Sequence, residues 1–295
     1  MIQSANKILV PIDFSEQSLI ALEQSYNLAK GLKAEITLLY VIEEAGLISK
    51  FFSSKQQDTI KKSIQEQLDK LAADVQKKAK IKVNTLVGKG SVYLKINEVA
   101  ELINAKMIVM GAFGEGKRKK RFIGSNALGV VRESKIPVIT INGKVHRNGC
   151  RNIVLPLDLS KETREKVSKA IELSKLFDGA VIRIVSVLFT TDEFVVNRLT
   201  RQLGQVKAFL EKEGIECTAE IIKGIKGEET LAQNILEYAV KVDGDLILIM
   251  TQQEVDFTKY FIGSSAQEII NNSSIPVLSI IPLPKKDKTL FPNPY

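Results

Sequence analysis

The stretch GAFGEGKRKKRFIGSNA, which begins at Gly111, combines four glycines, five cations and a serine. Gly111 and Gly114 lack a Cβ atom, so the backbone there can turn sharply and let a phosphate group approach closely. Gly124 directly precedes a helix that we predict to begin at Ser125, and the free N–H groups of a helix start bind anions. The cations of residues 117–121 would screen a polyphosphate. These residue types in this order predict a phosphate site.

Taken singly, each glycine is better explained as a strand end, and each cation as part of a solvated loop. The set is more specific, because the spacing of Gly, two residues, Gly, nine residues and Gly-Ser follows an apolar run, KMIVMG. It is not the P-loop pattern, which ends in Gly-Lys-Ser/Thr, nor the dinucleotide fingerprint, which follows a first strand.

Short apolar runs alternate with helical periodicity around this stretch. We predict strands at residues 7–13, 35–43, 81–90, 106–111 and 136–142. We predict helices at residues 18–31, 55–80, 96–105 and 125–134, the first capped by Ser15 and closed by Gly31. The alternation indicates a doubly wound α/β domain with a parallel sheet.

In such a sheet, ligands bind beyond the carboxyl ends of the strands, where the strand order reverses. The loops after the first and fourth strands are therefore the candidates. The first loop holds Pro11, Ile12 and Asp13, and the second is the glycine-containing stretch. A carboxylate at Asp13 can accept hydrogen bonds from ribose hydroxyls, although an Asx turn or a helix cap would also explain an aspartate after a strand.

The chain is a tandem repeat. NKILVPIDFSEQ, residues 6–17, matches RNIVLPLDLSKE at an offset of 145, and FIGSNALGVVRESKIPVITI, residues 122–141, matches FIGSSAQEIINNSSIPVLSI at an offset of 139. We therefore predict two tandem five-stranded domains, residues 1–145 and 146–295.

The second copy keeps the Gly263-Ser264 pair but not the rest of the motif. Met250 or Thr251 stands where Gly111 is expected, Gln253 or Glu254 replaces Gly114, and Ser186 replaces Val41. Side chains at the glycine positions would crowd a phosphate. We predict that the second half does not bind a nucleotide in this way, and that Asp158, which aligns with Asp13, is not a ligand contact.

Charge and composition narrow the class of protein. The net charge is +8; the first half has 23 Lys and Arg against 14 Asp and Glu (+9), the second 19 against 20 (−1). This excess of positive charge in the first half suits an acidic partner. Because the sequence has no Trp and no recognition-helix motif, we disfavour nucleic acid as that partner. We see no signal-peptide pattern, no spanning segment and no metal spacing of the two cysteines, and we expect a cytoplasmic protein.

The pattern Gly111-x2-Gly114-x9-Gly124-Ser125 is similar to the nucleotide-binding motif of universal stress proteins. The VPIDFS segment and the final IPVITI strand resemble the same family, and the resemblance covers both halves. It implies a Rossmann-like fold of the adenine nucleotide α-hydrolase type, with the last strands of two domains paired. Here IPVITI and IPVLSI would pair within one chain as a pseudo-dimer, and a homodimer of whole chains stays open.

The resemblance also implies roles for particular residues. In the ATP-binding branch of that family, Asp13 would lie near the ribose and adenine, and Val41 would contact adenine through its backbone. Ser125 and the glycine loop would hold the phosphates, with Met110 and Asn126 beside them. ATP, with or without magnesium, is the implied ligand of the first half alone.

The leading hypothesis is thus an ATP-binding regulatory module of a stress response, acting on an unknown protein partner. The one histidine, His146, lies in the linker, and no catalytic triad or nucleophile elbow is present. Slow ATP hydrolysis, or nucleotide handling by an enzyme on the same fold, is the alternative. A nucleotide-independent interaction scaffold is the third reading.

Overall fold

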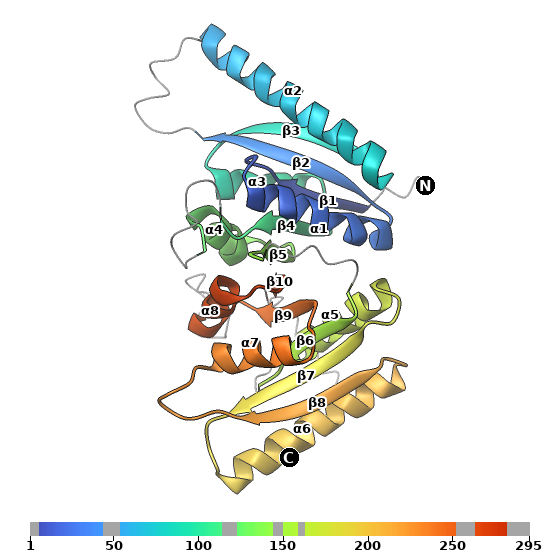
Figure 1. Cartoon of the computed structure of the whole chain (residues 1–295), viewed down its shortest axis with the longest axis vertical. Coiled ribbons are helices and arrows are strands. Elements are labelled where there is room, and N and C mark those ends of the chain that lie inside the picture. The colour runs from blue at the N-terminus through green and yellow to red at the C-terminus, as the bar shows by residue number, and fades with distance from the viewer. Residues whose placement is uncertain are drawn as a thin grey trace.

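The structure, a computed structural model, describes residues 6–43, 54–113, 123–143, 150–158, 163–251 and 263–281. Figure 1 shows the two halves stacked along the long axis, with β5 and β10 meeting at the centre. No helix in these ranges is both long enough and apolar enough to cross a membrane.

The first half alternates strands and helices in the predicted order. Its strands are β1 (Asn6–Pro11), β2 (Ala34–Glu43), β3 (Val83–Gly90), β4 (Met107–Gly111) and β5 (Val138–Ile141). Its helices are α1 (Glu16–Leu32), α2 (Ser54–Ala79), α3 (Val92–Leu102) and α4 (Ser125–Glu133).

The second half repeats this order. Its strands are β6 (Asn152–Pro156), β7 (Val181–Leu188), β8 (Cys217–Lys223), β9 (Leu246–Met250) and β10 (Val277–Ile280). Its helices are α5 (Thr163–Leu176), α6 (Glu193–Lys212), α7 (Leu231–Lys241) and α8 (Ser264–Asn272).

All the strands described join in one sheet with the order β3-β2-β1-β4-β5-β10-β9-β6-β7-β8. Within each half the strands are parallel. At the junction β5 and β10 pair antiparallel, with Ile139 opposite Leu278. The prediction of two doubly wound five-stranded halves whose last strands pair is confirmed, and the pairing makes one continuous sheet of ten strands.

The strand order reverses beside β1. This strand pairs with β2 on one side and with β4 on the other. The chain therefore winds outward from β1 to β3 and then returns to add β4 and β5. The loops after β1 and β4 consequently leave the sheet side by side, as the doubly wound topology requires.

Helices cover both faces of the sheet. Ile8 and Val10 of β1 face the core that includes α1, α2, α5 and α6, whereas Leu9 faces the core that includes α3, α4 and α7. This alternation follows from the period of two in a strand. Each core contains residues of both halves, so apolar packing is continuous across the junction.

The first helix begins as predicted and ends differently. Ser15 is its N-cap and accepts a hydrogen bond from the N–H of Ser18 at 3.2 Å. The left-handed residue that closes α1 is Lys33 (φ 49°), and Gly31 lies inside the helix. A Cβ on Gly31 would lie 3.2 Å from the carbonyl oxygen of Leu176, so this glycine permits close packing of α1 against α5 of the other half.

Candidate functional site

A cavity of about 370 Å³ opens where the strand order reverses in the first half. Nine of the ten site residues expected from the sequence line it: Pro11, Ile12, Asp13, Val41, Met110, Gly111, Gly124, Ser125 and Asn126. The tenth, Gly114, lies outside the described residues, as do the cations of residues 117–121.

The lining also includes residues that the sequence analysis did not name. They are Ser18, Leu39, Tyr40, Glu43, Val92, Ile96, Ala112, Phe113 and Ala127. Two simple patterns could have found some of them. Leu39 is two residues before Val41 on one strand, and Val92 and Ile96 are four apart on one helix, so each pair shares a face.

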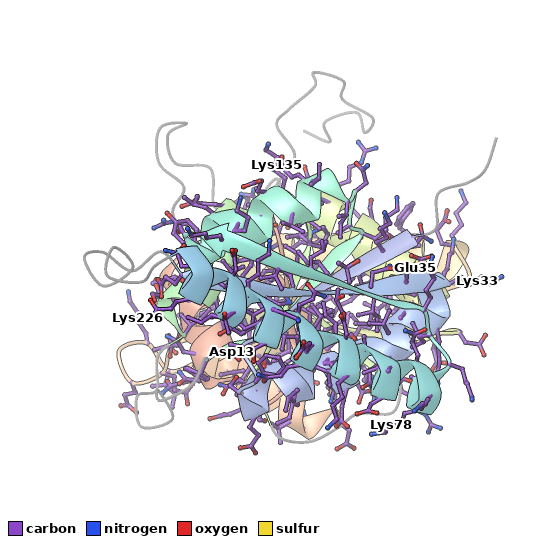
Figure 2. The ribbon with its side chains drawn as sticks, turned by 90° about the horizontal axis from the view of Figure 1, so that it is seen from above. Asp13, Lys33, Glu35, Lys78, Lys135 and Lys226 are labelled. Carbon is purple, nitrogen blue, oxygen red and sulfur yellow. The ribbon has the colours of Figure 1, made fainter. Side chains whose placement is uncertain are left out.

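Asp13 follows β1, and Figure 2 shows it toward the end of the sheet opposite Lys33 and Glu35. Its Oδ1 accepts a hydrogen bond from the N–H of Ser15 at 3.0 Å, so the Asx-turn interpretation is correct for this oxygen. The side chain is nevertheless exposed on the cavity wall. A carboxylate has about four acceptor positions, so capacity for ligand hydroxyls remains.

The residue after Asp13 has an unusual backbone. Phe14 has φ of 61°, in the left-handed region that a bulky residue rarely adopts. Its ring contacts that of Tyr40 with the centroids 5.7 Å apart. Strained residues of this kind collect at ligand sites, where the surrounding packing holds them in place. The aromatic contact thus fixes the turn that carries Asp13.

The N-terminus of α4 forms the opposite wall. Gly124 is the N-cap, and no side chain caps the helix there. The first intrahelical hydrogen bond runs from the N–H of Leu128 to the carbonyl of Gly124. The N–H groups of Ser125, Asn126 and Ala127 therefore precede the helical ladder, and all three residues line the cavity. A helix of nine residues directs its positive dipole end here, which favours an anion.

Between these two polar walls the cavity is apolar. Leu39, Val92, Ile96 and Met110 contribute hydrophobic side chains, and Val41 lies at its edge on β2. The cavity thus combines an apolar wall, an exposed carboxylate and a helix N-terminus. A planar base, a sugar and a phosphate chain need these three environments in this combination.

Gly111 also has a packing role, which the sequence analysis did not anticipate. A Cβ there would lie 2.9 Å from Cβ of Gln17 and 3.1 Å from its carbonyl carbon. Because these atoms belong to the first turn of α1, any side chain at Gly111 would push that helix away from β4. The glycine is required by packing between α1 and β4, whether or not a phosphate approaches it.

The equivalent region of the second half is arranged differently. Asp158 lies 3.8 Å from Nζ of Lys166, whose side chain is only 10% exposed. The hydroxyl of Ser186 donates to the carbonyl oxygen of Leu157 at 2.5 Å. The carboxylate and the hydroxyl at these positions therefore bond within the protein. The N–H of Gly263 bonds to the carbonyl of Thr251, as the N–H of Gly124 bonds to the carbonyl of Ala112. Thr251 is therefore equivalent to Ala112, and Met250 is equivalent to Gly111.

Other chemistry is not built into the described parts of the chain. They contain no cluster of three or more His, Cys, Asp or Glu side chains that could hold a metal ion. Cys150 and Cys217 are buried, and neither forms a disulfide bond. Burial raises the pKa of the Cys217 thiol, which keeps it in its unreactive protonated form. His146 lies outside the described residues.

Known proteins resemble this chain in sequence and in fold. The chain matches the universal stress protein family twice, over residues 5–142 and over residues 149–280. Universal stress protein MJ0531 of Methanocaldococcus jannaschii is 30% identical over 165 residues, which are 50% of this chain and 92% of that protein. Universal stress protein YxiE of Bacillus subtilis is 27% identical over 145 residues, 46% of this chain and 98% of its own.

The whole two-half arrangement also has a solved counterpart. The crystal structure of a universal stress protein from Archaeoglobus fulgidus superposes with a TM-score of 0.75 at 24% identity, covering 94% of this chain and 96% of that one. At this identity the similarity establishes the fold. Together with the two family matches, it shows that the chain belongs to the universal stress protein family, with two copies of the domain in tandem.

Proposed function

We propose that the first half binds ATP in the cavity at its strand-order reversal, and that the protein acts as a nucleotide-dependent regulatory module. One observation carries the proposal. The free N–H groups at the start of α4, the exposed Asp13 carboxylate and an apolar wall all face a single cavity of about 370 Å³. This volume lies in the range of small-molecule sites.

Each wall would hold a different part of the nucleotide. The N–H groups of Ser125 and Asn126 would bind phosphate oxygens, with the Ser125 hydroxyl as a further donor. Asp13 would accept hydrogen bonds from the ribose hydroxyls. The base would lie against the apolar wall, beside the main chain of Val41. A magnesium ion would accompany the phosphates, and no described cluster of side chains is arranged to bind it alone.

We further propose that only the first half binds ATP. In the second half Asp158 is paired with Lys166, and the hydroxyl of Ser186, at the position of Val41, is bonded to the carbonyl of Leu157. A ribose there would have to displace an ion pair.

Regulation suits the site better than catalysis. Phosphoryl transfer to water needs a group that positions the water or the metal. Among the described lining residues, Asp13 and Glu43 are the carboxylates, and we assign Asp13 to the ribose hydroxyls rather than to a water. We therefore propose that the site binds ATP and hydrolyses it slowly at most. Multiple-turnover hydrolysis of ATP that Asp13→Ala abolishes would favour the enzyme instead.

Calorimetric titration of ATP tests the site. Ser125→Pro removes the N–H and the hydroxyl at the first position of α4, where proline suits the helix and Gly124 already has the extended conformation that precedes a proline. Because hydrogen bonds to charged groups contribute about 1.5–3 kcal/mol, we expect ATP affinity to fall roughly tenfold to a hundredfold.

The chain supplies a matched control. Ser264→Pro makes the same change at the first position of α8, where Gly263 has nearly the same backbone angles. It should leave ATP affinity unchanged. Equal affinities of the wild type, Ser125→Pro and Asp13→Ala would refute the proposed site, and a calorimetric stoichiometry of two ATP molecules per chain would refute the restriction to the first half.

A further inference from the structure

The end of α8 in the second half contacts the residue that precedes Gly124, which lines the cavity of the first half. The N–H of Ile123 donates to Oδ1 of Asn271 at 2.7 Å. Ile123 is buried and immediately precedes Gly124, the N-cap of α4. Figure 1 shows α8 beside α4 at the junction, and because the two halves meet antiparallel, the end of α8 lies at the start of α4.

Asn271 is itself held firmly in place. Its main-chain carbonyl accepts a hydrogen bond from Nδ2 of Asn142 at 2.9 Å. Gly143, the next residue, packs so closely on the carbonyl of Ser274 that a Cβ there would collide with it. The residues that follow β5 therefore contact the end of α8 closely, and these contacts fix the position from which the Asn271 side chain bonds to Ile123.

The contact acts on the part of the site that would bind phosphate. The N–H of Gly124 bonds to the carbonyl of Ala112 at 2.8 Å, directly beyond β4. Ile123 and Gly124 are thus bonded to two different elements, α8 on one side and the exit of β4 on the other. The peptide units held in this way set the direction in which the first N–H groups of α4 point.

The equivalent position in α4 has a side chain that cannot give the same support. The offset of 139 between the copies places Arg132 of α4 at the position of Asn271 in α8. A guanidinium group has five donors and no acceptor, so it cannot accept a hydrogen bond from a main-chain N–H as Asn271 does. Arg132 is instead bonded to Glu133 at 2.7 Å.

From these contacts we infer that Asn271 is a positioning residue for the nucleotide site of the other half. The inference rests on the proposed function, since it concerns how that site is held. The second copy would then contribute to nucleotide binding through α8 although its own cavity region lacks the motif.

Affinities for ATP and for adenosine, measured by calorimetry and by competition with a fluorescent adenosine analogue, test the inference. Loss of a hydrogen bond of ordinary strength at Asn271→Ala should weaken ATP binding about threefold to tenfold. Adenosine affinity should stay within twofold, because adenosine has no phosphate to contact α4. Asn271→Asp keeps an acceptor oxygen and should restore most of the ATP affinity.

Two further variants complete the experiment. Asn272→Ala, at the exposed neighbouring position of α8, should bind ATP as the wild type does. Asn142→Ala loosens Asn271 without altering it, and should weaken ATP binding in the same direction by a smaller factor. It also decides the question if Asn271→Ala does not fold.

The outcomes separate the two ideas. If the wild type does not bind ATP, the proposed function fails and this inference fails with it. If the wild type binds and Asn271→Ala binds ATP equally well, only the inference is overturned. Equal weakening of ATP and adenosine in Asn271→Ala would also overturn it, because a general loss of structure would have that effect.

Discussion

Glu35 shows how single residues stabilise the end of the sheet away from the cavity (Figure 2). Its carboxylate accepts hydrogen bonds from Nζ of Lys82 at 2.7 Å and from Nδ2 of Asn84 at 2.9 Å. These bonds, first that from Lys82 and then that from Asn84, hold the pKa of Glu35 below its ordinary value of 4.5. They link the start of β2 to the start of β3.

This lowered pKa predicts a pH dependence of stability. Below pH 4.5 the unfolded chain takes up a proton at Glu35 before the folded chain does, so the free energy of unfolding falls as the pH drops toward the folded pKa. Above pH 4.5 the contribution is fully present. Urea unfolding of Glu35→Gln between pH 3 and 6 should give a flatter profile than the wild type. Lys82→Met should lie between them, and identical slopes for all three proteins would contradict the assignment.

At the scale of elements, two glycines show the difference between a closely packed position and an open one. Gly111 lies where β4 meets the first turn of α1, and a Cβ there would approach Gln17 to 2.9 Å. Gly204 is exposed within α6, and a Cβ added to it would meet no other atom within 4 Å. The same substitution should therefore have opposite effects at the two sites.

We predict that Gly111→Ala lowers the free energy of unfolding by roughly 1–3 kcal/mol, because α1 must shift. Gly204→Ala should raise it by about 0.5–1 kcal/mol, because alanine is the better residue in a helix interior. Chemical denaturation of both variants measures the difference. A stabilised Gly111→Ala protein would show that the contact with Gln17 is not tight.

Most elements could be predicted from the sequence because their signals are local. Periodicity indicates the long amphipathic helix α2, and the polar turn after each apolar run indicates the strand ends. The position of Asp13 at the cavity followed from topology alone. Where the chain departs from expectation, the cause is tertiary: Gly31 lies inside α1 and faces Leu176 of the other half.

The contact between Asn271 and Ile123 could not have been predicted in the same way. It joins residues 148 positions apart, and nothing in either neighbourhood signals the other. The lining residue Tyr40 was also missed, since its type and its position on β2, between Leu39 and Val41, do not distinguish a cavity wall from an ordinary strand.

At the scale of the whole molecule, the halves share both cores and one sheet. Leu278 of β10 is fully buried opposite Ile139 of β5. We predict that the chain unfolds in a single calorimetric transition, whose calorimetric and van't Hoff enthalpies agree. Two separate transitions in the wild type would contradict the continuity of the cores.

Two matched substitutions test whether the junction couples the unfolding of the two halves, since both remove a fully buried leucine. Leu278→Ala at the junction and Leu68→Ala in α2 should each cost about 2–5 kcal/mol. Only Leu278→Ala should also split the transition, because it weakens the contact through which one half stabilises the other.

The antiparallel pairing of β5 with β10 has a consequence for how such a protein can evolve. In a dimer of two identical chains around a two-fold axis, every substitution occurs twice, so a residue that helps one site must occupy the same place at the other. Joining the copies in one gene removes that constraint. Asparagine and arginine can then occupy the equivalent positions 271 and 132, so the two copies can acquire different roles.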